Sequence, residues 1–169
     1  MPSSETFAVR PIREFVIRFL KDGMISVDAF ARDSTLCTFT NDLNPNTSAE
    51  YHLDAVEFLG QLYDAGMVAD LGILDPPYSV RQVAECYKSV GKQVTQQDTR
   101  SDTYTKFRTA MDKLIVVGGV VLSFGWNSVG MGINRGYEIE EILLVCHGGV
   151  HNDTICMAER KIILKEDTR

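Results

Sequence analysis

Short apolar segments alternate with amphipathic segments along most of this chain, and this alternation limits the fold more than any other feature. Helical spacing of apolar residues predicts helices over 11–21, within 49–63, over 79–90 and over 104–114. Strand-like segments occupy 24–27, 37–40, 67–74, the second half of 115–124, 139–146 and 154–164. Gly148-Gly149 and Asn152-Asp153 supply turn residues between the last two strands, which predicts an antiparallel pair. The pattern predicts an α/β fold with a mostly parallel sheet and one reversed strand.

Length and composition are those of an ordinary globular chain. A chain of 169 residues fits one domain, so we expect a single domain over 1–169. The longest apolar stretch, 114–124, is shorter than the roughly 20 residues that cross a bilayer, and the first six residues are polar. We therefore expect a cytoplasmic protein without a membrane partner; a phage-encoded copy would act in the host cytoplasm.

Carboxylates follow three of the predicted strands directly. These are Asp28, Asp42 and Asp75, and the last parallel strand ends at 123–126. In an open α/β sheet, ligands bind outside the carboxyl ends of the strands. Three acids at one predicted sheet edge therefore indicate a ligand site there.

Asp75-Pro76-Pro77-Tyr78 is the motif with the most specific chemistry. Two prolines fix the backbone and leave carbonyls without amide donors beside them. An exocyclic amine on a base is a poor nucleophile, because its lone pair is delocalised into the ring. A carboxylate and a carbonyl that accept its two hydrogens would expose the lone pair, and an aromatic ring would stack on an extruded base. A rigid turn after a buried strand is the structural alternative.

This motif resembles that of the DNA amino-methyltransferases, the adenine-N6 and cytosine-N4 enzymes. The resemblance implies a Rossmann-like class I methyltransferase fold with a C-terminal antiparallel hairpin and S-adenosylmethionine as cofactor. It also implies that Asp75 and the Pro76 carbonyl bind the target amine, with Pro77 shaping the turn and Tyr78 stacking on the base. The small size is similar to that of compact adenine methylases carried by phages and mobile elements.

The resemblance extends to three cofactor segments. The proline-started helix at 10–15 looks like the family's opening motif, Asp42 like its ribose-binding acid, and Asp54 like the acid that receives the adenine amine. The structural alternatives are an Asx turn at Asp42 and a helix-terminal acid at Asp54. The cofactor-binding residues implied are Arg10, Pro11, Ile12, Asp28, Ala29, Phe30, Asp42, Leu43, Asp54, Ala55 and Asp75.

The loop after the first strand departs from the family. Residues 27–34 contain no glycine, whereas the family has a glycine-rich loop there that lets the backbone approach the cofactor. Either the cofactor sits differently, or Arg32 and Ser34 supply replacement contacts, or affinity is low. Arg32 is equally well interpreted as an exposed loop arginine.

Substrate contacts are expected from the polar segment at about 92–105, which we interpret as a mobile loop, and from the loop after the last parallel strand. The residues implied are Tyr78, Ser79, Arg81, Lys92, Arg100, Trp126 and Asn127. Neither loop is long enough for extended base readout, so we expect a short or loose sequence preference, or a dimer that completes the site; the protein is expected to be a monomer or a homodimer. Cys146, His147 and His151 lack an evident fourth ligand, so we expect a glycine turn and no metal there.

DNA is the expected partner, with RNA as the alternative. The net charge of −6 gives no general attraction to phosphate, although a local basic face remains compatible with it. Two further hypotheses stay open: a methyltransferase of RNA or of protein glutamine, and a non-catalytic nucleic-acid-binding scaffold with weakened cofactor binding.

Overall fold

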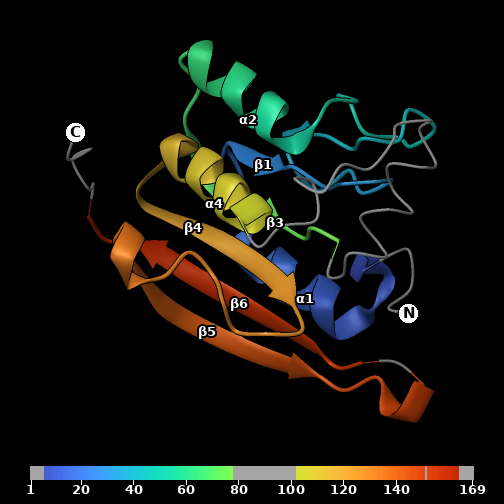
Figure 1. Cartoon of the computed structure of the whole chain (residues 1–169). Coiled ribbons are helices and arrows are strands. Elements are labelled where there is room, and N and C mark those ends of the chain that lie inside the picture. Colours follow the sequence, from blue (N-terminus) through green and yellow to red (C-terminus); the bar gives the residue numbers. More distant parts are fainter. Residues whose placement is uncertain (1–5, 78–101, 151, 164–169) are drawn as a thin grey trace.

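A six-stranded sheet forms the centre of the computed structural model, which describes residues 6–77, 102–150 and 152–163 (Figure 1). The strand order is β2-β1-β3-β4-β6-β5. β1, β2, β3 and β4 run parallel, whereas β6 is antiparallel to both β4 and β5. The strands are β1 Ser26–Asp28, β2 Phe39–Thr40, β3 Ala69–Leu74, β4 Ile115–Gly125, β5 Tyr137–Val145 and β6 Thr154–Lys161. The predicted mostly parallel sheet with a terminal antiparallel hairpin is confirmed.

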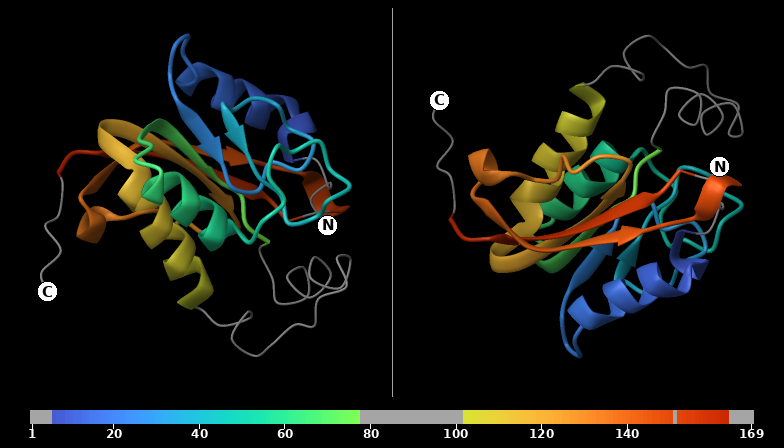
Figure 2. Two further views of the ribbon diagram at one scale, coloured as in Figure 1. Left: turned by 90° about the horizontal axis from the view of Figure 1, so that it is seen from above. Right: turned by 90° about the horizontal axis from the view of Figure 1, so that it is seen from below.

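Helices cover both faces of this sheet, as Figure 2 shows. α1 (Arg10–Phe19) lies on one face, and α2 (Ala55–Asp64) and α4 (Asp102–Leu114) pack together on the other. Pro11 stands in the first turn of α1, where its missing N–H is not needed. Short 3₁₀ helices lie at η1 (Thr6–Ala8), η2 (Ile133–Arg135) and η3 (Gly148–Val150).

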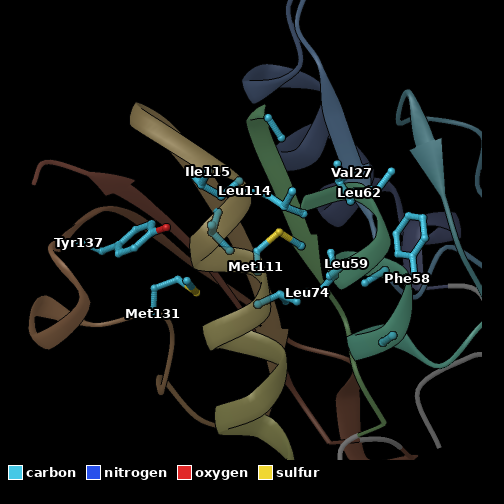
Figure 3. Packing of buried hydrophobic residues seen from close by; sticks show 14 residues of the cluster. Val27, Phe58, Leu59, Leu62, Leu74, Met111, Leu114, Ile115, Met131 and Tyr137 are labelled. Carbon is cyan, nitrogen blue, oxygen red and sulfur yellow. The ribbon is translucent and has the colours of Figure 1, made fainter. Parts of the chain in front are cut away.

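Each face of the sheet has its own hydrophobic core. Under α2 and α4, Phe58, Leu59 and Met111 pack on the strands with at most 1% of each residue exposed (Figure 3). Under α1, Ile12, Phe15 and Val16 pack against β3, β4 and β6. Two apolar layers on one sheet explain why the central strands read as continuous apolar runs.

Two predicted boundaries were wrong. The strand predicted over the second half of 115–124 begins at Ile115, and its pairing with β3 has a bulge or irregularity between Ile115 and Val120, the stretch that contains Gly118 and Gly119. Gly118 has a φ of +87°, which glycine adopts at little cost. The predicted mobile loop at 92–105 is helical from Asp102, where α4 begins, and an acid is favoured at a helix N-terminus. Residues 92–101 lie outside the described residues.

A buried glutamate holds the loop between β4 and β5. Glu159, 1% exposed on β6, accepts hydrogen bonds from the backbone N–H groups of Met131 (2.6 Å) and Gly132 (2.9 Å). A Cβ at Gly130 would lie 1.8 Å from Oε2 of Glu159, so only glycine fits there. Arg108 donates to the Gly130 carbonyl (3.1 Å) from α4. Nothing in the sequence pattern marks Glu159 as different from the exposed glutamates of β5.

Replacing Glu159 by alanine is expected to lower the free energy of unfolding by roughly 2–4 kcal/mol, because two buried backbone donors lose a charged acceptor. Denaturant unfolding measures the change. Glu138→Ala, on the exposed part of β5, is the matched control and should shift stability by no more than about 0.5 kcal/mol. Equal effects of the two substitutions would contradict the role given to Glu159.

No helix within the described part of the chain is long and apolar enough to cross a membrane.

Candidate cofactor and active site

The sheet changes direction between β1 and β3. The chain leaves β1 towards β2 on one side and leaves β3 towards β4 on the other, which makes this pair the topological switch point. In doubly wound folds, ligands bind in the crevice outside the carboxyl ends of such strands. A pocket of about 360 Å³ lies there, within the usual size range of small-molecule sites. Its walls are Thr6, Phe7, Ala8, Arg13, Phe30, Ala31, Arg32, Asp33, Ser34, Thr35, Leu36 and Asp75.

Asp28 ends β1 two residues before the pocket-lining Phe30; it does not line the pocket itself and is completely buried. Its Oδ1 accepts the Phe30 N–H (3.0 Å), whereas its Oδ2 has no hydrogen-bond partner among the described residues. The pKa of Asp28 is raised to about 8, mainly by burial; the hydrogen bond from the Phe30 N–H lowers it, and the negative charges of Asp75 and Asp42 raise it. A buried carboxyl with an unused oxygen is unfavourable by itself and suits a site that receives a cationic ligand.

The Asp75-Pro76-Pro77 turn follows β3 directly, and Asp75 lines the pocket. Pro76 is buried and Pro77 half-buried. We expected the proline carbonyls to be free acceptors, but the Pro77 carbonyl accepts a hydrogen bond from the Tyr104 hydroxyl of α4. Burial raises the pKa of Tyr104, which keeps it a donor. Tyr104 therefore anchors the turn, a role that its place in an apolar helix period did not indicate.

The glycine-free loop after β1 does use a left-handed backbone conformation. Arg32 has a φ of +51°, and among the described residues no other non-glycine residue has a positive φ. Arg32 is the second residue of a turn closed by the Ser34 N–H on the Ala31 carbonyl (2.8 Å). The Ser34 Oγ is buried without a hydrogen-bond partner in the described part of the chain. Ala29 is buried, and Phe30 packs edge-on against Phe107 with ring centroids 5.0 Å apart.

The two acids expected at the adenosine end both make the local contacts that were their structural alternatives. Asp42 accepts the Asn44 N–H (2.8 Å) in an Asx turn, with Leu43 half-buried between them. Asp54 caps α2 through the Val56 N–H (2.9 Å). Ala55 lies in the core under α2. Neither acid lines the pocket described above. A local hydrogen bond through one carboxylate oxygen is compatible with a ligand contact through the other.

Asn41, beside Asp42, braces this side of the site. It is 1% exposed, and its Nδ2 donates to the Ala29 carbonyl (3.2 Å) and the Leu53 carbonyl (3.1 Å). Its Oδ1 accepts the Leu53 N–H (2.9 Å). Asn41 thus joins the loop after β1 to the segment before α2. The sequence pattern does not indicate this role, because an asparagine before Asp42 looks like one more turn residue.

The N-terminal segment meets the pocket through residues other than those predicted. Arg10 is exposed and pairs with Glu14 (2.7 Å), Pro11 is exposed, and Ile12 is buried in the core. The pocket is instead lined by Thr6–Ala8 and Arg13. Phe7 holds this segment against Phe124 at the end of β4, with ring centroids 5.5 Å apart.

The predicted substrate residues are only partly described. Trp126 is 38% exposed at the end of β4, and the Asn127 side chain accepts the Val129 N–H (3.1 Å). Neither lines the pocket. The other predicted substrate residues, Tyr78, Ser79, Arg81, Lys92 and Arg100, lie outside the described residues.

No protein-family model and no curated protein matches the sequence. Solved structures do match. SMU.776, a candidate methyltransferase complexed with SAH, aligns with 91% of this chain and 49% of its own (TM-score 0.64, 10% identity). NSun6 from Pyrococcus horikoshii, solved with SFG, aligns over 85% and 49% (TM-score 0.54, 17% identity). The candidate methyltransferase yhhF from Escherichia coli aligns over 92% and 88% (TM-score 0.58, 9% identity).

The chain has the class I methyltransferase fold. It spans about half the length of the first two structures. SAH and SFG, the ligands of those two structures, are analogues of S-adenosylmethionine. At such low sequence identity the similarity is one of fold only. Which ligand and substrate bind has to be inferred from the residues of the pocket.

Proposed function

We propose that this protein is an S-adenosylmethionine-dependent methyltransferase that modifies the N6 amine of adenine in DNA. The observation that carries this proposal is the pocket at the switch point, which brings the Asp75-Pro76-Pro77 turn together with the loop after Asp28. The fold supports methyl transfer, and the aspartate-proline-proline turn supports an amine on a planar base as acceptor.

The pocket residues fit this cofactor chemically. S-adenosylmethionine carries a sulfonium, an ammonium and a carboxylate close together. The pocket offers the carboxylate of Asp75 and the guanidiniums of Arg13 and Arg32, and the buried Asp28, with an unused oxygen, stands two residues before the pocket-lining Phe30. When bound, the cofactor supplies an electrophilic methyl group. Cations near Asp28 would favour its ionised form, which compensates for the cost of burying that carboxylate.

The chain's own part in the reaction is to position and polarise the amine. Asp75 accepts an N–H of the base, so that the nitrogen lone pair faces the methyl carbon. A bound cofactor would supply its methyl group to this nitrogen and leave as the neutral thioether, and the methylated amine would release one proton to solvent to give the neutral product. The Pro77 carbonyl, held by Tyr104, keeps the turn that carries Asp75 rigid.

The direct test combines calorimetry with transfer of a labelled methyl group. We expect the protein to bind SAH and to label double- or single-stranded DNA, with N6-methyladenine as the product identified by mass spectrometry. RNA and a glutamine-containing protein substrate are run in parallel. Labelling of RNA or protein in place of DNA would contradict the substrate but not the reaction. SAH binding without labelling of any acceptor, or no SAH binding at all, would contradict the enzyme and favour a scaffold.

A further inference from the structure

Arg32 occupies a backbone conformation that favours another residue. Its φ of +51° lies in the region that glycine, asparagine and aspartate adopt most readily, and its turn type usually has glycine at this position. Arginine therefore makes the loop less stable than glycine would. A strained residue of this kind commonly persists where its side chain has a use that its backbone conformation opposes.

The side chain of Arg32 shares the pocket with one other cation, Arg13 of α1. Both residues are exposed, and in the described part of the chain neither guanidinium has a hydrogen-bond or ion-pair partner. Asp33, the neighbouring acid, accepts the Ser48 N–H (2.8 Å) instead. Two arginines from separate elements thus line one pocket without pairing to its acids.

The opposite charge lies on the strand ends. Asp75 lines the pocket, and the buried Asp28, near enough to Asp75 for their charges to interact, has an oxygen without a partner among the described residues. A pocket with guanidiniums on its loop and helix side and carboxylates at the strand ends is complementary to a zwitterion. Arginine suits the carboxylate of such a ligand, because its planar fork donates two parallel hydrogen bonds.

We propose that Arg32, together with Arg13, binds the carboxylate of the cofactor's methionine part, so that a side chain does here what a glycine-rich loop does elsewhere. This inference rests on the proposed function. It makes Arg32 a specificity residue: the pocket selects ligands that carry the amino-acid end over ligands that lack it.

The test compares two ligands that differ in that end. SAH has the amino acid, and 5′-methylthioadenosine has the same adenosine and thioether without it. We expect Arg32→Gly to weaken SAH binding at least tenfold by calorimetry and to change 5′-methylthioadenosine binding by less than twofold. Arg32→Lys, which keeps the charge but not the fork, should fall between. Because glycine suits the turn, the ligand-free Arg32→Gly variant should unfold at the same or a higher temperature.

Arg18→Ala, which removes an arginine from α1 that pairs with Glu141 and does not line the pocket, is the control and should bind both ligands normally. Unchanged SAH affinity in Arg32→Gly, or equal weakening of both ligands, would overturn the carboxylate role while leaving the proposed function intact. If the unmodified protein binds neither SAH nor 5′-methylthioadenosine, the proposed function and this inference are both overturned.

Discussion

Replacing Asp75 by alanine is expected to lower the rate of methyl transfer at least about 100-fold, because the target amine loses its charged acceptor in the transition state. The loss should appear mainly in kcat, since the side chain acts on the reacting nitrogen. Single-turnover transfer of a labelled methyl group to DNA measures it. Asp75→Asn, which keeps an acceptor oxygen without the charge, should retain more activity than alanine.

Two controls make the Asp75 experiment specific. Asp64→Ala, an exposed acid at the end of α2, should leave the transfer rate unchanged. Thermal unfolding should show that Asp75→Ala is folded at the temperature of the transfer assay. Equal transfer by Asp75→Ala and the unmodified protein would remove Asp75 from the reaction.

The second large effect concerns Asp28 and pH. An aspartate has a pKa near 3.8 in the unfolded chain, and burial raises the pKa of Asp28 to about 8 in the folded protein. Between these values the folded state binds more protons than the unfolded state, so stability falls as pH rises from about 4 to about 8. Asp28→Asn should flatten this part of the curve, with a gain of roughly 1–2 kcal/mol near pH 5 that grows to several kcal/mol near pH 8.

Denaturant unfolding at pH 5, 6, 7 and 8 measures this difference. Asparagine keeps an oxygen for the Phe30 N–H, so the loop after β1 should keep its conformation. Asp70→Asn is the control. Asp70 lies on β3, beside β1, and accepts the Ile25 N–H (2.9 Å), but it is only half-buried. A pH dependence that is the same in both variants would rule out Asp28 as its source.

Asp28 and Arg32 point to the same trade between stability and function. Each is less favourable in the folded chain than a simple substitute, asparagine at position 28 and glycine at position 32. Arg32 lines the pocket, and Asp28 stands two residues before the pocket-lining Phe30. Residues that cost stability and gather at one site are typical of ligand binding, where the ligand supplies the missing interactions.

The elements and the sheet edge that carries the site could be predicted from local pattern. Among the described residues, apolar period located the helices and strands to within a few residues; Asp28 ends its strand, and Asp42 and Asp75 follow theirs. The helix predicted over 79–90 lies outside the described residues. These features are local, because the apolar pattern of about four to fifteen consecutive residues is enough to indicate a strand or a helix face. The class of fold followed from their order along the chain.

Partners across the fold could not be predicted in this way. Tyr104 donates to the Pro77 carbonyl across 27 residues of sequence, and Glu159 accepts from Met131 across 28. Arg13 and Arg32 line the same pocket only because α1 and the loop after β1 both border it. Such contacts depend on loop conformation and on how helices settle on the sheet, which residue period does not encode.

The sequence by itself determined the alternation of elements, the acids at the strand ends and the aspartate-proline-proline turn. Only the tertiary structure decided that Asp28 is buried with an unused oxygen and that Arg32 takes a left-handed backbone conformation. The physical reason is that burial and backbone strain arise from the packing of distant segments, whereas strand ends and turns arise from neighbouring residues.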